Sequence, residues 1–336
     1  MNIYDIAQEA GVSIATVSRV LNHKGAVGAA TREKVEAVLA RHNYAPSAIA
    51  RGMAGKPLRT VAVLTVDIRV PHYARTAYTM EQEFSRRGYE VILCNTGGDG
   101  GAALRYLNAV TRKQVDGMVL VGSVFNRIGR EPEVEAILKK VPVVLANGAL
   151  DLPGSRSVLV DDAAGIRAAA EHLLARGRKD IVYIKDLDTA SADAKRDGFL
   201  SVLEGGRIIE AENGVDAARQ LLSSGQRFDA VVCGEDLTAA QVVNELCRAG
   251  LRVPEDVAVT GYNCSVYSTL SRPSLTSVDN KPEEVAARCV ELLENLMEGN
   301  EEVTSVSITP ELVPGESTCG DAPAGNAWAA RPPAGA

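Results

Sequence analysis

The chain has 336 residues, of which 46% are hydrophobic and 24% charged, a balance that is typical of a globular protein of two or three domains and excludes wholesale disorder. No stretch approaches the roughly 18 uninterrupted apolar residues of a membrane span, and the N-terminus lacks the basic-then-apolar layout of a secretory signal. The net charge of −7 is unevenly distributed, with +4 on residues 1–60 and −11 on the remainder. Either residues 1–60 alone bind a polyanion, or they form a solvated, mildly basic helical domain.

The first sixty residues have the pattern of short helices. Four are predicted: one opened by Asn2, and three over about Ile14–Leu21, Thr31–His42 and Ser47–Ala54. Gly11 stops the first helix, and Gly28 stands at the N-cap of the third, where glycine is only slightly worse than serine. Gly52 makes the fourth helix marginal on its own.

From Thr60 onward, strands and helices alternate. Strands are predicted over Val61–Val66, Glu90–Cys94, Gly117–Val121, Val141–Ala146, Ser157–Val160, Ile181–Ile184, Arg207–Ile209, Ala230–Val232 and Val257–Thr260. Helices between them are predicted over Ala74–Arg87, Ala102–Arg112, Ala163–Arg176, Val215–Leu222 and Leu237–Ala249. This alternation indicates an α/β fold with parallel sheets, and its length favours two lobes with a ligand held between them.

Several kinds of site are not expected. Six cysteines and four histidines show neither zinc-ligand spacing nor a disulfide pattern, so we expect no metal, reduced thiols and a cytoplasmic protein. The glycine-rich stretch Asn95–Gly101 lacks the third glycine of a dinucleotide loop and has no phosphate-binding lysine, so no cofactor is expected. An enzyme is a rival interpretation that no base–nucleophile pair supports.

The segment Asp5–Asn22, DIAQEAGVSIATVSRVLN, combines a helix, a tight turn with glycine, and a second helix that carries hydroxyls and an arginine. This is the layout of a helix-turn-helix, in which the second helix enters the major groove of DNA. An αα-hairpin used for packing would show part of the same pattern.

The same segment resembles the DNA-binding head of the lactose/galactose/purine repressor family, whose signature is close to DVAxxAGVSxATVSRVLN. The resemblance continues through Thr31–Val35 and Asn43–Arg51. In the body it includes Asp67–Tyr73, Val115–Gly117, Asp161–Gly165, Phe228–Val231, Val253–Val257 and Glu316–Thr318, so it spans about residues 2–319.

The resemblance implies which residues contact DNA. Ile14 and Ala15 take the positions that face base edges, where apolar side chains can pack on thymine methyl groups. Met53 stands where the family usually has a leucine that wedges into the minor groove. The whole implied set is Ser13, Ile14, Ala15, Thr16, Ser18, Arg19, Asn22, Ala50, Arg51 and Met53.

The resemblance also implies an effector cleft between two Rossmann-like lobes of the periplasmic-binding-protein type. Its implied lining residues are Asp67, Tyr73, Lys195, Asp236 and Asn263. Lys195 replaces the family's arginine, and neighbouring Arg196 is a candidate to compensate for it. Asn263 replaces an aspartate common in sugar-responsive members.

The resemblance divides residues 1–319 into a helix-turn-helix domain (1–45), a hinge helix and linker (46–59) and an effector-binding and dimerisation domain (60–319). The Ala/Gly/Pro-rich composition of residues 320–336 predicts a disordered tail. Lobe one is expected over about 60–160 and 280–302, and lobe two over about 161–279 and 303–319. It implies a homodimeric transcription regulator, a repressor of a pseudopalindromic double-stranded DNA operator gated by a carbohydrate-like effector. An activator, a corepressor-type regulator and a sugar receptor without a DNA role are the alternatives.

Overall fold

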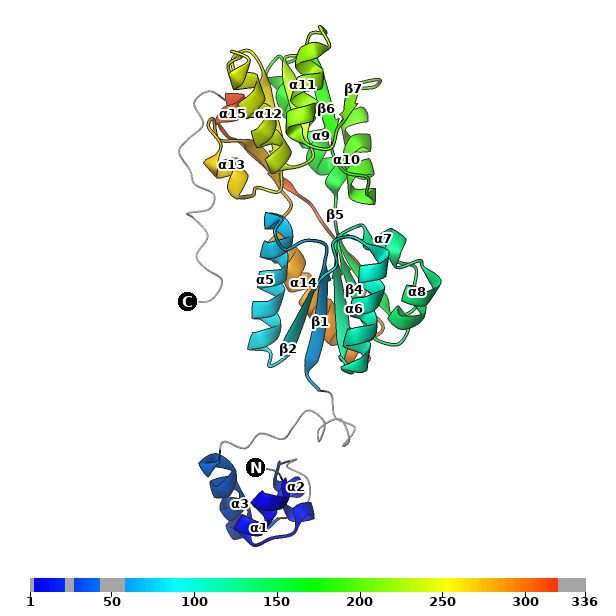
Figure 1. Cartoon of the computed structure of the whole chain (residues 1–336), viewed down its shortest axis with the longest axis vertical. Helices are drawn as coiled ribbons and strands as arrows, with labels where there is room; N and C mark the ends of the chain where they lie inside the picture. Colours follow the sequence, from blue (N-terminus) through cyan, green and yellow to red (C-terminus); the bar gives the residue numbers. More distant parts are fainter. Residues whose placement is uncertain (1–2, 22–26, 43–57, 320–336) are drawn as a thin grey trace. The chain divides into compact units, whose positions relative to one another are not determined.

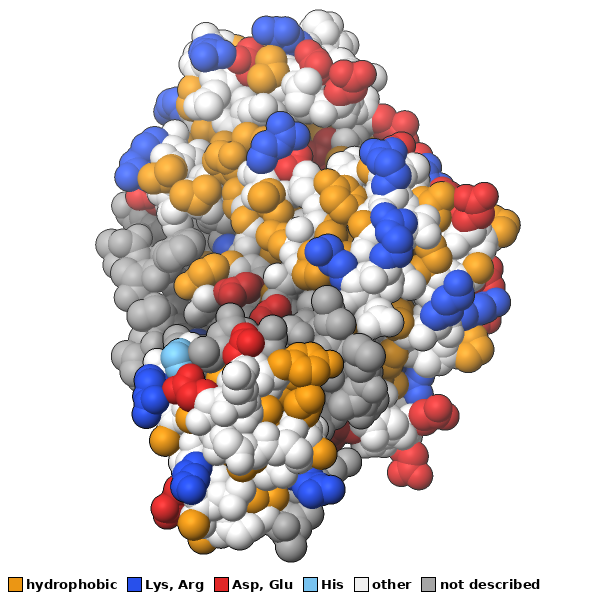
Figure 2. Space-filling view, turned by 60° about the horizontal axis from the view of Figure 1, so that its bottom comes forward, with side chains coloured by type: hydrophobic (Ala, Val, Ile, Leu, Met, Phe, Trp, Pro, Cys, Tyr) orange, Lys and Arg blue, Asp and Glu red, His pale blue; other side chains and the backbone are white. Residues whose placement is uncertain are grey.

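The computed structural model describes residues 3–21, 27–42 and 58–319 and divides into two compact units, Met1–Leu58 and Arg59–Ala336 (Figure 1). The predicted fourth helix and the predicted disordered tail lie outside the described residues. Over the described part of the face drawn in Figure 2, lysine and arginine side chains are spread among aspartate and glutamate. No helix in the described ranges is both long enough and apolar enough to cross a membrane.

The first unit packs three helices, α1 (Ile3–Ala10), α2 (Ile14–Leu21) and α3 (Ala29–Arg41), around one small core. The buried residues of this core come two from each helix: Ile6, Ala7, Val17, Val20, Val35 and Val38. Gly28 is the N-cap of α3 and supplies no side-chain cap, as the sequence predicts. Glu9 on α1 contacts the C-terminal end of α3, because its carboxylate lies 2.8 Å from both Arg41 Nη1 and His42 Nε2.

The second unit contains two six-stranded sheets, one in each lobe. The first sheet has the order β11-β5-β4-β3-β1-β2 and consists of β1 (Thr60–Thr65), β2 (Glu90–Asn95), β3 (Gly117–Val121), β4 (Val143–Ala146), β5 (Ser155–Val160) and β11 (Val306–Ile308). The second has the order β12-β10-β9-β8-β6-β7 and consists of β6 (Ile181–Lys185), β7 (Arg207–Glu210), β8 (Ala230–Cys233), β9 (Ala258–Tyr262), β10 (Thr276–Asp279) and β12 (Glu311–Val313). All pairings are parallel except that of β12 with β10.

Helices cover both faces of each sheet (Figure 1). On the first sheet, α5 (Pro71–Arg86) and α14 (Pro282–Met297) pack on one face, and α6 (Gly100–Arg112), α7 (Phe125–Ile128) and α8 (Pro132–Leu138) pack on the other. On the second sheet, α11 (Gly214–Ser223) and α12 (Asp236–Arg248) face α9 (Asp162–Ala175) and α10 (Ala190–Leu200) across the strands. Two short helices, α13 (Val266–Leu270) and α15 (Glu316–Cys319), complete the second lobe. Buried strands such as Gly117–Val121, with every residue inside, explain the continuous apolar runs in the sequence.

The chain crosses between the lobes three times, after β5, after β10 and between β11 and β12. The third crossing differs from the expected boundary near residue 303. Val306–Ile308 pairs in parallel with Val158–Val160, so this strand belongs to lobe one and only residues from about 309 return to lobe two. A strand of three residues is too short to show an alternation of apolar and polar residues in the sequence. Its place in the sheet is determined by its pairing with β5 instead.

Candidate functional site

The helix-turn-helix is built by short-range hydrogen bonds. Gly11 adopts φ +66°, and the amide of Val12 donates to the Ala7 carbonyl at 3.0 Å, which reverses the chain after α1. Ser13 then begins α2: its Oγ accepts from the Thr16 amide at 3.2 Å and lies 2.9 Å from the Thr16 hydroxyl. Ser13 and Thr16 are thus held as a cap, and α2 starts at a defined place.

The two sides of α2 differ as a recognition helix requires. Val17 and Val20 are buried in the core of the unit, while Ser13, Ile14, Ala15 and Arg19 are exposed, with 40% of the Ile14 surface accessible. Thr16 and Ser18 are half-buried beside them. The remaining predicted DNA contacts, Asn22, Ala50, Arg51 and Met53, lie outside the described residues.

One further exposed side chain in this unit is absent from the predicted set. Tyr4, on α1, has 66% of its surface exposed, and a tyrosine presents both a ring and a hydroxyl to a partner. Tyr4 lies in the first turn of α1, where the sequence has no periodic signal that separates a contact residue from an ordinary surface residue.

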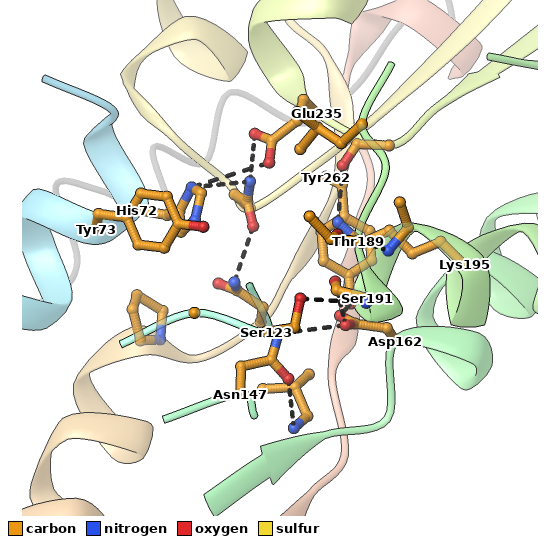
Figure 3. A pocket seen from close by; sticks show the side chains of 18 of the residues that line it. His72, Tyr73, Ser123, Asn147, Asp162, Thr189, Ser191, Lys195, Glu235 and Tyr262 are labelled. Atoms are coloured by element: carbon orange, nitrogen blue, oxygen red, sulfur yellow. Dashed lines mark hydrogen bonds and ion pairs between the residues drawn. The ribbon is translucent and has the colours of Figure 1, made fainter. Parts of the chain in front are cut away.

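A cavity lies between the lobes of the second unit, at the carboxyl ends of the parallel strands (Figure 3). Lobe one contributes the start of α5, with His72 and Tyr73, and the loops after β3 and β4, with Ser123 and Asn147. Lobe two contributes polar side chains from the ends of its strands, from the loops that follow them and from the helices α9 and α10. They are Asp162, Asp186, Thr189, Ser191, Lys195, Glu235, Tyr262 and Asn263.

Three of the five predicted effector residues, Tyr73, Lys195 and Asn263, line this cavity, whereas Asp67 and Asp236 do not. Asp67 pairs with Arg69, with 2.6 Å between Oδ2 and Nη2, and this hydrogen bonding lowers the pKa of Asp67 to about 2.

Asp236 is buried and holds together the strand ends of lobe two. Its carboxylate accepts from the Ser277 hydroxyl and from the Ser265 amide, both at 2.6 Å. Burial raises its pKa to about 6. The residue before it, Glu235, faces the cavity instead, because neighbouring residues at the start of α12 point in different directions.

Lys195 reaches the cavity from α10 and is almost fully buried. Its ammonium donates to the Gly234 carbonyl at 2.9 Å and lies 3.8 Å from the centre of the Tyr262 ring, a favourable cation–π distance. Arg196 does not substitute for the missing arginine: it pairs with Asp193 and Asp197, at 3.0 and 2.8 Å, and does not line the cavity.

Glu235 is the centre of a chain of polar contacts (Figure 3). Its Oε2 accepts from Asn263 Nδ2 at 2.6 Å, and Asn263 Oδ1 in turn accepts from Asn280 Nδ2 at 2.8 Å. His72 Nδ1 lies 4.0 Å from Glu235 Oε1 and 3.4 Å from Asn263 Nδ2. Burial raises the pKa of Glu235 to about 8 and lowers the pKa of His72 to about 3, so both side chains are largely neutral at pH 7.

Asp162 is the second polar centre. Its carboxylate accepts from the Tyr262 hydroxyl at 2.6 Å, from Ser191 Oγ at 2.5 Å and from Asn147 Nδ2 at 3.2 Å. The donor Asn147 comes from lobe one, so this carboxylate links the two lobes. Such a set of fixed donors and acceptors suits recognition of a small polar molecule.

Five of the cavity residues that the sequence prediction missed share one signal. Ser123, Asn147, Asp162, Asp186 and Glu235 each follow a predicted strand by one to three residues. In a parallel sheet these positions gather at one edge, so the polar residue after each strand end is the pattern that could have found them.

Two family models match separate parts of the chain. Residues 2–47 match the family of bacterial regulatory proteins of the lacI type, and residues 170–318 match a periplasmic binding protein-like domain. The catabolite control protein A of Priestia megaterium is 34% identical over 323 residues, covering 92% of this chain and 95% of the relative. An HTH-type transcriptional regulator of Lachnoclostridium phytofermentans is 32% identical over 331 residues, covering 95% and 99%.

Among solved structures, a lac repressor dimer bound to operator and the anti-inducer ONPF superposes with a TM-score of 0.85 at 26% identity, covering 95% of this chain and 99% of the other. The helix-turn-helix unit and the two-lobed unit are therefore both accounted for by membership of one protein family. The chain belongs to the lacI family of bacterial regulatory proteins and is a helix-turn-helix transcriptional regulator.

Proposed function

We propose that this regulator is a repressor that binds a pseudopalindromic operator as a homodimer and releases or tightens it when a carbohydrate-like effector occupies the interlobe cavity. The observation that carries the proposal is the cavity itself, in which buried polar side chains of both lobes meet. Hydroxyl-rich ligands need such alternating donors and acceptors, and the ring of Tyr73 offers an apolar face beside them.

Direct contacts between the lobes support control through their arrangement. The Ser191 amide donates to Ser123 Oγ at 3.3 Å, and Arg75 Nη1 donates to the Cys264 carbonyl at 3.1 Å. A ligand that inserts between these groups favours one lobe arrangement over another, so it shifts the population that is competent to bind DNA. A coupling of about 1–3 kcal/mol changes operator affinity about 5–150-fold.

The exposed side of α2 supports operator recognition by the head. Ile14 and Ala15 present only apolar groups, whereas Arg19 can donate to a guanine or a phosphate. Ala50, Arg51 and Met53 are proposed to contact the minor groove next to the half-site. In a two-fold dimer, two such heads read two inverted half-sites.

Two exposed apolar side chains support a homodimer. Tyr78 on α5 has 67% of its surface exposed, and Leu93 on the edge strand β2 has 49% exposed. Both belong to the part of lobe one where α5 packs on β2. The similar lac repressor structure is a dimer, and a second copy of this chain is the partner that we propose for this surface.

The operator is best found by selection. Full-length protein is incubated with random duplex DNA, and the bound sequences are amplified and read over several rounds. We expect an enriched pseudopalindrome with two inverted half-sites. A single non-repeated site, or no enrichment over input, would contradict the dimeric operator-binding proposal. Adding carbohydrates to the binding reaction with the selected duplex then tests effector control.

A further inference from the structure

This inference rests on the proposed function and concerns the charge of the effector. The side chains that line the cavity with an ionisable acidic or basic group, apart from His72, are Asp162, Asp186, Glu235 and Lys195. Three of them are acidic and one is basic, and no arginine is found among the described residues of the lining. The wall therefore lacks the forked cation that proteins use to grip a phosphate or carboxylate.

The single lysine is already engaged. The Lys195 ammonium donates to the Gly234 carbonyl and lies against the Tyr262 ring, so part of its charge is satisfied before any ligand enters. The nearby arginines are held elsewhere: Arg75 by Glu283 and the Cys264 carbonyl, and Arg196 by two aspartates. Within the part of the chain that the structure describes, no guanidinium lines the cavity to receive an anionic ligand.

The carboxyl groups of the lining also disfavour an anionic ligand. Asp162 accepts from three donors, and Asp186 accepts from the Thr238 hydroxyl. Glu235 accepts from Asn263 through Oε2, whereas the contact of its Oε1 among the described residues is His72 Nδ1 at 4.0 Å, which is beyond hydrogen-bond distance. Burial raises the pKa of Glu235, so a negative charge on this side chain is unfavourable in the cavity.

We propose that the cavity binds an uncharged polyhydroxylated ligand and rejects phosphorylated and carboxylated ones, a preference set by the carboxyl groups of Asp162 and Asp186 and strengthened by Glu235 when it ionises. A hydroxyl group can accept from the protonated Glu235 carboxyl, donate to Asp162, and accept from Lys195 or Asn263. A phosphate in the same place would lie against the carboxyl groups of Asp162 and Asp186, and above about pH 8 also against a charged Glu235, and like charges at such short range repel.

The test uses full-length protein and matched pairs of ligands: glucose with glucose 6-phosphate, glucuronate and glucosamine, and ribose with ribose 5-phosphate. Binding is measured at constant ionic strength by thermal shift and calorimetry. We expect any sugar that binds to do so in its uncharged form, with its anionic partner about 100-fold weaker or more. The ratio of the two affinities should rise between pH 7 and pH 9 in wild type and stay flat in Glu235→Gln, as Glu235 ionises only in the former. The exposed Glu212→Gln variant is the matched control and should follow wild type.

A phosphorylated or carboxylated ligand that binds wild type as tightly as its uncharged partner would overturn the inference, and loss of that binding in Lys195→Met would identify Lys195 as the group that holds the anion. Inorganic phosphate is the probe that separates this inference from the proposed function. If no sugar binds and inorganic phosphate is also rejected, the carbohydrate effector is contradicted while the exclusion of anions is supported. If inorganic phosphate stabilises wild type but not Lys195→Met, the exclusion is wrong whatever the sugars do.

Discussion

Replacing Glu235 by glutamine removes one buried titration and should change how stability depends on pH. Because burial raises the pKa of Glu235 from 4.5 to about 8, the folded protein keeps a proton that the unfolded chain releases. The stability linked to this proton is therefore fully present below pH 4.5 and is lost as the pH rises through about 8. Glutamine keeps the size of the side chain and can still accept from Asn263, but it does not titrate.

The magnitude follows from the pKa and the exposure. At about 1.4 kcal/mol per pH unit, the raised pKa corresponds to at most about 5 kcal/mol. The Glu235 side chain keeps 19% of its surface exposed, so we expect about half of this value, or about 2–3 kcal/mol. Wild type should thus lose about 2–3 kcal/mol more than Glu235→Gln between pH 5 and pH 8.5.

The assay is urea unfolding of the full chain at several pH values, followed by a signal from the second unit. Asp236, with its pKa raised to about 6, and His72, with its pKa lowered to about 3, titrate in both proteins, so their contributions largely cancel in the difference. Glu212→Gln, at an exposed position, should parallel wild type. Parallel pH profiles for wild type and Glu235→Gln would refute the assignment of Glu235 as a buried, protonated carboxyl.

Four further outcomes are expected. Arg19→Ala should weaken binding to the selected operator by at least about 10–100-fold without changing the thermal midpoint, and unchanged gel-shift titrations would remove Arg19 from the interface. Met53→Ala should weaken operator binding more than binding to random DNA; equal losses on both would contradict the wedge. Lys195→Met should weaken the sugar that binds wild type by about 10–100-fold, measured by calorimetry beside the exposed control Lys140→Met, and equal affinities would exclude Lys195 from the site. Leu93→Lys should shift the protein from dimer to monomer in light scattering at micromolar concentration, and an unchanged mass would place the dimer contact elsewhere.

Elements with a strong local pattern could be predicted from the sequence. Helix α2 has its predicted bounds because Ser13 caps it and Val17 and Val20 supply a clear apolar side. Strand β3 has its predicted bounds as well, because all of its residues are buried and apolar. Helix α14 is missing from the predicted elements although Val285, Cys289 and Leu293 follow helical spacing, so that signal was available.

Other features depend on partners far along the chain. Strand β10, Thr276–Asp279, is fully buried but polar in sequence, and its Thr276 and Ser277 hydroxyls are satisfied by Gly315 and Asp236. No local sequence pattern indicates that these buried hydroxyl groups find hydrogen-bond partners elsewhere in the chain. The same holds at the cavity, where two adjacent carboxyls, Glu235 and Asp236, are indistinguishable in sequence but face opposite surroundings, one the ligand space and the other the strand ends.

The three crossings between the lobes also constrain how the protein is made on the ribosome. The first lobe begins at Thr60, yet its sheet is completed only by Val306–Ile308 and one of its faces is covered by α14. A nascent chain that stops before residue 306 therefore lacks the strand that pairs with the edge of β5. We therefore expect the two lobes to reach their final packing only late in synthesis, whereas the core of the small head is formed by residues of its own three helices.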